Sequence, residues 1–259
     1  MLEANRNLEL KTYLIMISGL SLLTGFNSYI AGGNQFITNS LPLPGLLQIV
    51  LNMLIVLFLY GILGLYGIKI GREFNLPGIW PDQYPGFSYW LEPFLIGFIL
   101  TLLYIFLDLS FAPLHNLGYL PQPELPEAFL IVVISAVSGE LLFRLFLIPF
   151  GAYLIVLLWR KFGGIGLAAK ERIIRRIFWP LAGFSGLVYV FSYLPNLIYA
   201  YGVESLSNIP VLLLVQLLLM YGSLGMLTAW QYRRHGFLAA VQVHFWAALF
   251  WHIGWGGML

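Results

Sequence analysis

The sequence predicts an all-α fold, a polytopic membrane helix bundle of about seven transmembrane helices that forms a single membrane domain over residues 1–259. Of the residues, 60% are hydrophobic and only 9% are charged, whereas a soluble domain carries about 25% charged residues. Seven apolar segments reach the roughly 20 residues that a helix needs to cross the hydrocarbon core. The net charge of +2 gives no reason to expect a nucleic-acid partner, and the absence of cysteine excludes a thiolate metal site.

The predicted spans are apolar runs bounded by polar residues or turn residues. They are Thr12–Ile30, Leu46–Ile68, Leu91–Phe111, Ala128–Trp159, Phe178–Tyr201, Pro210–Trp230 and Gly236–Trp255. The second follows Pro42 and Pro44, which suit a loop or a helix start better than a helix interior. The fourth is longer than one crossing needs, and Pro149 within it predicts a kink close to Arg144.

Lysine and arginine predict the orientation of the bundle. All of the 13 basic residues except Arg144 precede the first span or follow the second, fourth and sixth spans. The connections after the first, third and fifth spans contain none. The positive-inside rule therefore predicts a cytoplasmic N-terminus. We expect an integral membrane protein of a prokaryotic plasma membrane, surrounded by membrane lipids, with a thylakoid or another internal membrane as the alternative.

Glu140 and Arg144 lie four residues apart in the otherwise uncharged fourth span. Positions i and i+4 share a face of a helix, and glutamate before arginine is the favoured order for pairing. An isolated charge within a membrane costs at least about 2.5–3.5 kcal/mol, so such residues normally pair and face the protein interior. The two residues are expected to form either a structural ion pair that holds helices together or part of an intramembrane site.

Further polar residues occur within the predicted spans. His244 and His252 lie eight residues apart, which is too far for one unbroken helix to offer both to a single metal ion. Each is expected to be either a hydrogen-bonded structural residue or a ligand. Asp108 lies near the outer end of the third span, where we expect it to be hydrated. Tyr189 and Tyr193, one turn apart, can offer hydroxyl groups to the interior or serve as packing aromatics.

Three stretches resemble the motifs of the CPBP family of intramembrane proteases, which includes the CAAX prenyl endopeptidases. Ser138–Arg144, with the sequence SGELLFR, is similar to the first motif, EExxxR. Ser185–Pro195 is similar to the second motif, FxxxH followed by Leu-Pro. Arg234–Ala248 is similar to the third, in which a basic residue and glycine precede an apolar run ending in HxxxN or HxxxD. The resemblance covers a family-like core of about residues 128–252.

The departures from the family pattern fall on positions that carry its chemistry. Gly139 stands at the first glutamate, which the resemblance assigns as the general base. Tyr189 and Tyr193 replace the phenylalanine and histidine of the second motif, and Ala248 replaces the final Asn or Asp of the third. The candidate catalytic residues are the retained positions Glu140, Arg144 and His244, and the candidate cavity-lining residues are Gly139, Tyr189, Tyr193, Ala248 and His252.

The leading hypothesis is a catalytically degraded relative that binds, regulates or forms a complex with another membrane protein or a lipidated protein, without a metal or other cofactor. Glu140 has the spacing of the second glutamate and is expected to face Arg144, since the π-bulge that would re-aim it is rare. The alternative is an active intramembrane endopeptidase that uses Glu140, His244 and Tyr193 on a membrane-embedded or prenylated protein. An active enzyme of this family would imply zinc.

Overall fold

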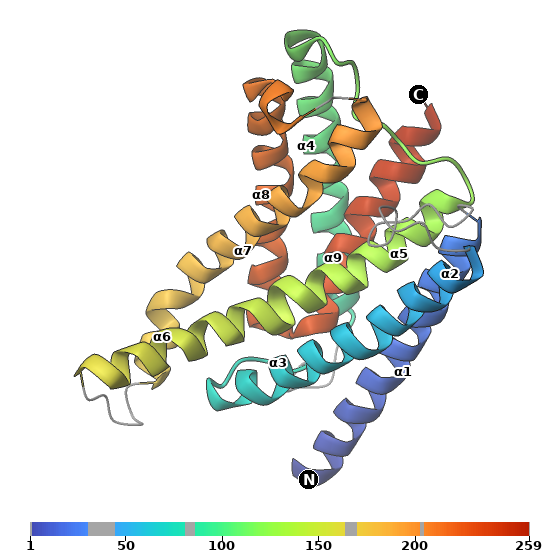
Figure 1. Ribbon diagram of the computed structural model, residues 1–259. Helices are drawn as coiled ribbons and strands as arrows, with labels where there is room; N and C mark the ends of the chain where they lie inside the picture. Colours follow the sequence, from blue (N-terminus) through green and yellow to red (C-terminus); the bar gives the residue numbers. More distant parts are fainter. Residues whose placement is uncertain (1, 31–44, 81–85, 164–169, 203–204, 259) are drawn as a thin grey trace.

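The computed structural model describes residues 2–30, 45–80, 86–163, 170–202 and 205–258. Over these residues every regular element is a helix, and seven helices are long and apolar enough to cross a membrane. The predicted all-α class and the seven spans are confirmed. The two ends of the chain lie at opposite ends of the bundle (Figure 1), and the side of the membrane on which the N-terminus lies stays a prediction.

The helices follow the predicted spans closely, and three spans are assembled from more than one helical segment. The second span consists of α2, η1 and α3, the fourth of α5, η2 and α6, and the seventh of α9, η5 and η6. The elements in order are α1 Leu2–Ile30, α2 Gly45–Leu54, η1 Ile55–Tyr60, α3 Gly61–Glu73, α4 Ser88–His115, α5 Glu127–Glu140, η2 Leu141–Leu147, α6 Ile148–Gly163, α7 Lys170–Tyr201, η4 Leu206–Asn208, α8 Val211–His235, α9 Phe237–Leu249, η5 Phe250–Trp255 and η6 Gly256–Met258. Of these, η1, η2 and η5 are π-helical.

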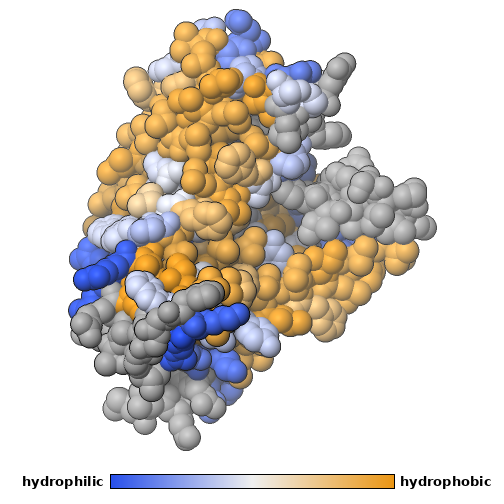
Figure 2. Space-filling view, turned by 60° about the vertical axis from the view of Figure 1, so that its left-hand side comes forward, coloured by the Kyte–Doolittle hydropathy of each residue, from blue (hydrophilic) through white to orange (hydrophobic). Residues whose placement is uncertain are grey.

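The helix α9 occupies the centre of the bundle, where it packs against α4, α5 and α8. On one side the hairpin of α1 and α2–α3 lies along α5 and α6, with α3 against η2 (Figure 1). On the other side α7 and α8 pack together, and α8 also contacts α4. The visible surface is mostly apolar, with hydrophilic residues gathered toward its ends (Figure 2). This distribution is what a lipid-facing surface requires.

Two apolar cores stabilise this arrangement. The first joins α1, α3, η2, α6 and the start of α9, and its fully buried members include Tyr13, Leu145, Ile148 and Phe237. The second joins α4, α7, α8 and the rest of α9, and includes Leu100, Leu217, Met220 and Val243. Because η2 belongs to the first core and α9 contributes to both, polar residues on η2 and α9 can meet where the cores adjoin.

The fourth span changes to π-helical geometry at Leu141–Leu147. Pro149 has no N–H group to donate to the carbonyl of Leu145, four residues earlier, and we attribute the interruption to this missing hydrogen bond. The Leu145 carbonyl lies against α3, because a Cβ atom added at Gly67 would overlap the Leu145 oxygen and lie 2.7 Å from its carbonyl carbon. The kink predicted near Arg144 is therefore a π-helical segment. The helix α3 can pack closely against this segment only because residue 67 is glycine.

Candidate functional site

Glu140 is the last residue of α5, and its side chain is fully buried. One carboxylate oxygen, Oε1, lies 2.8 Å from Nδ1 of His244 on α9. The other, Oε2, lies 3.1 Å from Nε of Arg144 on η2, and both side chains of this ion pair are 1% exposed. The Glu140 carboxylate therefore connects Arg144 and His244, the two other candidate catalytic residues that the resemblance implies.

This geometry corrects one expectation. Glu140 does pair with Arg144, as its spacing predicts, but it also faces His244. The π-helix that we did not expect begins at the next residue, Leu141. A π-helix turns less per residue than an α-helix, so the rotation from Glu140 to Arg144 is smaller than α-helical spacing would give, and the two side chains still pair. The two carboxylate oxygens of Glu140 thus reach one partner on the same span and another on α9.

Arg144 lies beside a close approach of α7 and α8 at Gly186 and Gly225. A Cβ atom added at Gly225 of α8 would lie 3.1 Å from Arg144 Nη2 and 3.1 Å from the Cα atom of Gly186 on α7. The absence of a side chain at Gly225 thus leaves the volume that the guanidinium fills. The Glu140 carboxylate compensates the buried charge, because an ion withdrawn from solvent is tolerated in a protein interior only with an opposite charge nearby.

The second ring nitrogen of His244 also has a partner. Its Nε2 lies 3.4 Å from the hydroxyl oxygen of Tyr189 on α7. If Nδ1 donates to the carboxylate of Glu140, then Nε2 accepts from the hydroxyl of Tyr189. Arg144, Glu140, His244 and Tyr189 therefore form one chain of polar contacts, which we call the polar tetrad. It connects α5, η2, α7 and α9.

Gly139 lies beside the tetrad. A Cβ atom added there would lie 3.3 Å from Cε1 of His244 and 3.9 Å from Cε2 of Tyr189. A side chain at this position would therefore enter the space next to the imidazole ring. The resemblance assigns a glutamate to the same position, and its absence leaves this side of His244 without a carboxylate.

The other cavity-lining candidates lie around the tetrad without joining it. The Tyr193 ring packs against Tyr221, with ring centroids 4.8 Å apart, and in the described part of the chain no hydrogen bond connects Tyr193 to the tetrad. Ala248 is buried, at 8% exposure. His252 pairs instead with Gln122, with its Nδ1 2.7 Å from Oε1. The two histidines of the seventh span thus have separate partners.

The tetrad does not fit the zinc ion that an active member of the family would imply. Among the described residues, no three His, Cys, Asp or Glu side chains cluster closely enough to hold a metal ion. A catalytic zinc site normally uses three protein ligands and keeps a further position for water. Here His244 and Glu140 are hydrogen-bonded to each other.

The expectation that Asp108 is hydrated is wrong. Its side chain is fully buried, and its Oδ1 accepts hydrogen bonds from Gln216 Nε2 at 3.0 Å and from the backbone N–H of Leu120 at 3.1 Å. Gln216 Oε1 lies 3.0 Å from Nε2 of His115, whose Nδ1 accepts from the N–H of Leu117. The chain after α4 folds back over the end of the helix and shields the carboxylate. This second polar cluster, Asp108–Gln216–His115, was missed by sequence reasoning.

The sequence contains a signal for the Asp108–Gln216–His115 cluster and for the close approach of α7 to α8. Gln216 is an amide within an apolar run, and such residues in membrane helices normally find a partner on another helix. Gly186 and Gly225 are small residues in two spans, which permit close helix approach but do not reveal which helices meet.

No family model, curated protein or solved structure matches this chain.

Proposed function

We propose that this protein is a catalytically degraded relative of the CPBP intramembrane proteases that binds, regulates or forms a complex with another membrane protein or a lipidated protein. The observation that supports this most directly is the internal pairing of the tetrad. Oε1 of Glu140 and both ring nitrogens of His244 have hydrogen-bond partners within the chain, and Oε2 of Glu140 lies within ion-pair distance of Arg144 without a hydrogen bond. A general base must instead direct an available lone pair at the proton that it removes.

The missing groups make ordinary peptide hydrolysis unfavourable. General-base assistance contributes about 10²–10⁴-fold in rate, and a single oxyanion-hole donor about 10²–10³-fold. Gly139 and Ala248 supply neither a carboxylate nor an amide at the corresponding motif positions. The described residues offer no metal cluster that could replace them, so the combined loss would leave little turnover.

The same residues suit an architectural role. The tetrad connects four helical segments through buried charge and hydrogen bonds, and removing any member would leave a partner unsatisfied.

The test compares the effect of losing the whole protein with the effect of losing only the side chains of Glu140 and His244. We would compare the parent strain, a deletion strain and a Glu140→Ala/His244→Ala strain by mass spectrometry of protein termini in the membrane fraction. The double variant must first be shown to accumulate at the parental level. The proposal predicts that deletion lowers the level of a membrane partner with no change in cleaved termini, while the variant retains that partner. Accumulation of the same uncut substrate in both strains would refute the proposal.

The second candidate is an active endopeptidase, and the order Glu140–His244–Tyr189 favours it. A carboxylate that orients one imidazole nitrogen while the other faces a hydroxyl is the arrangement of an activated base. Under this hypothesis the protein would cleave a membrane-embedded or prenylated protein with His244 as the base. Purified parent protein should then cleave such a substrate, and Glu140→Gln and His244→Ala should each abolish cleavage. No cleavage by the correctly folded parent would exclude this candidate.

A further inference from the structure

Arg233, in the last turn of α8, lies against two aromatic rings of α7. Its guanidinium carbon is 4.8 Å from the ring centroid of Phe178 and 5.8 Å from that of Trp179. Phe178 is fully buried and gives the guanidinium a fixed support, whereas Trp179 is 37% exposed. Contact with a ring uses the face of the planar guanidinium, so the N–H groups at its edge are left for another acceptor.

The charge of Arg233 is not balanced by an acidic residue, and this distinguishes it from its neighbour Arg234. Arg234 also lies over a ring, with its guanidinium carbon 5.4 Å from the ring centroid of Trp230. Its charge is paired, however, because its Nη1 lies 3.0 Å from Oε1 of Glu92. Among the side chains that the structure describes, no carboxylate lies within ion-pair distance of Arg233. Arg233 therefore combines an ordered position with an unbalanced positive charge.

A second arginine lies next to Trp179. Arg176 is exposed and precedes Trp179 by three residues on α7, so the two side chains share a face of the helix about one turn apart. No described carboxylate is within ion-pair distance of Arg176 either. Charged residues precede Trp179 on α7 and apolar residues follow it, and tryptophan is enriched at the membrane–water boundary. The two arginines thus lie at the depth of lipid headgroups.

An apolar stripe continues from these arginines along α7. Phe184, Leu187 and Phe191 lie farther into the same span, at helical spacing, and are 55%, 47% and 61% exposed. Gly183, one turn after the indole, leaves additional space, because no atom lies within 4 Å of a Cβ atom added there. An occupant with a negative charge at the boundary and a flexible apolar chain above it would match both parts of this surface.

We propose that Arg233 and Arg176 bind the phosphate of an anionic glycerophospholipid of the phosphatidylglycerol type. Each guanidinium offers a fork of N–H donors to the phosphate oxygens, and such charge-assisted hydrogen bonds are among the stronger ones. The indole of Trp179 would contact the glycerol backbone, and an acyl chain would lie along Phe184 and Leu187. The apolar stripe favours a lipid over free phosphate. This proposal does not depend on the function proposed for the tetrad.

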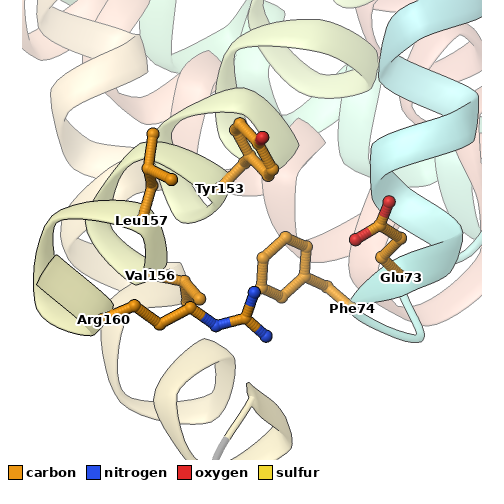
Figure 3. A pocket seen from close by; sticks show the side chains of 6 residues that line it. All are labelled: Glu73, Phe74, Tyr153, Val156, Leu157 and Arg160. Atoms are coloured by element: carbon orange, nitrogen blue, oxygen red, sulfur yellow. The ribbon is translucent and has the colours of Figure 1, made fainter. Parts of the chain in front are cut away.

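The charges around the two arginines select a headgroup with a net negative charge. Phosphatidylethanolamine and phosphatidylcholine carry a positive group beside the phosphate, and both Arg233 and Arg176 would repel it. The surroundings of Arg160 on α6 are different. Figure 3 shows Arg160 lining a shallow pocket together with Glu73 of α3, so a carboxylate accompanies the guanidinium there. Preference for an anionic lipid is therefore expected from the pair on α7 and α8.

Native mass spectrometry of the full chain, released from micelles with equal amounts of phosphatidylglycerol and phosphatidylcholine, measures this preference. We expect the parent to retain phosphatidylglycerol at least about tenfold more, since each basic residue near a membrane surface contributes roughly fivefold. Arg233→Gln and Arg176→Gln should each lower the preference by roughly fivefold. Arg234→Gln is the matched control and should behave like the parent, because it removes an arginine at the same helix end whose charge Glu92 already balances.

Three results would overturn the proposal. These are equal retention of the two lipids by the parent, the same loss of preference in Arg234→Gln as in Arg233→Gln, or displacement of the bound lipid by millimolar inorganic phosphate, which would show that the site binds phosphate alone. Arg233→Gln also removes a contact with Phe178, so the melting temperature of each variant is measured first in lipid-free detergent. Arg176→Gln changes an exposed side chain and should melt like the parent, so it tests the site even where Arg233→Gln is less stable.

Discussion

The contact between α3 and the π-helical segment yields the sharpest prediction, for Gly67→Ala. The nearest atoms to an added Cβ are backbone atoms of Leu145 and Phe146, including the Leu145 carbonyl carbon at 2.7 Å and the Phe146 Cα at 3.0 Å. An ordinary van der Waals contact begins at 3.4 Å. The two helices must therefore separate by at least about 0.7 Å at this point, the difference between 3.4 and 2.7 Å, because backbone atoms cannot rotate away as a side chain can.

Overpacking a close-packed interior typically costs about 1–3 kcal/mol. Because the obstruction at Gly67 is backbone, we expect Gly67→Ala to lie at the upper end, about 3 kcal/mol of unfolding free energy. That corresponds to roughly a hundredfold shift in the folding equilibrium. The separation would also displace η2, which carries Arg144, so weaker pairing with Glu140 should accompany the loss of stability.

The assay is unfolding in mixed detergent micelles, with Gly19→Ala as the matched control. Gly19 lies in a membrane-spanning helix, and no atom lies within 4 Å of its added Cβ. The control should be as stable as the parent or up to about 1 kcal/mol more stable, because alanine is favoured over glycine within a helix. Equal unfolding free energies for the two variants would show that α3 and η2 are not in the close contact described here.

Three further predictions concern buried polar residues. Arg144→Met should cost about 3–5 kcal/mol because it leaves a buried carboxylate unpaired, and adding Glu140→Gln should recover part of this; a double variant less stable than the single one would contradict the buried ion pair. Gln216→Leu should destabilise the protein by at least about 1 kcal/mol, because it leaves a buried carboxylate and imidazole without their shared partner; a melting temperature equal to the parent's would count against this bridge. Tyr189→Phe should cost less than about 1 kcal/mol, because its hydroxyl lies 3.4 Å from the imidazole, whereas His244→Ala should cost more; the reverse order would show that the tyrosine holds the tetrad together.

Much of the fold could be predicted from hydropathy because the bilayer imposes a length on every span. The helix α4 extends its predicted run at both ends, α7 begins eight residues before its run and α8 ends five residues after its run, since helices continue into the headgroup region after the apolar stretch ends. The pairing of Glu140 with Arg144 was also predictable, because a charged residue in a membrane needs a partner and the spacing supplied one.

The partner of His244 could not be predicted from the sequence. Its contact with Glu140 depends on how α5 and α9 pack and on the π-helix that starts after Glu140. Helical periodicity assumes a constant turn per residue, and a single π segment breaks that assumption. The burial of Asp108 could not be predicted for a different reason. Its shield comes from the chain after α4, whose path is set by tertiary contacts rather than by local pattern.

The π-helical segment also determines where the fourth span can lose a residue. A π segment can be regarded as an α-helix that has taken in one extra residue, and its wider turn absorbs the roughly 100° of rotation that this residue would otherwise add. Deleting a single residue from Leu141–Leu147 would therefore restore a continuous α-helix and leave the exposed leucines of α6 (Leu154, Leu157 and Leu158) facing nearly the same way. The same deletion in the α-helical part of α5 would turn every later side chain of the span by about 100° and send those leucines toward the interior.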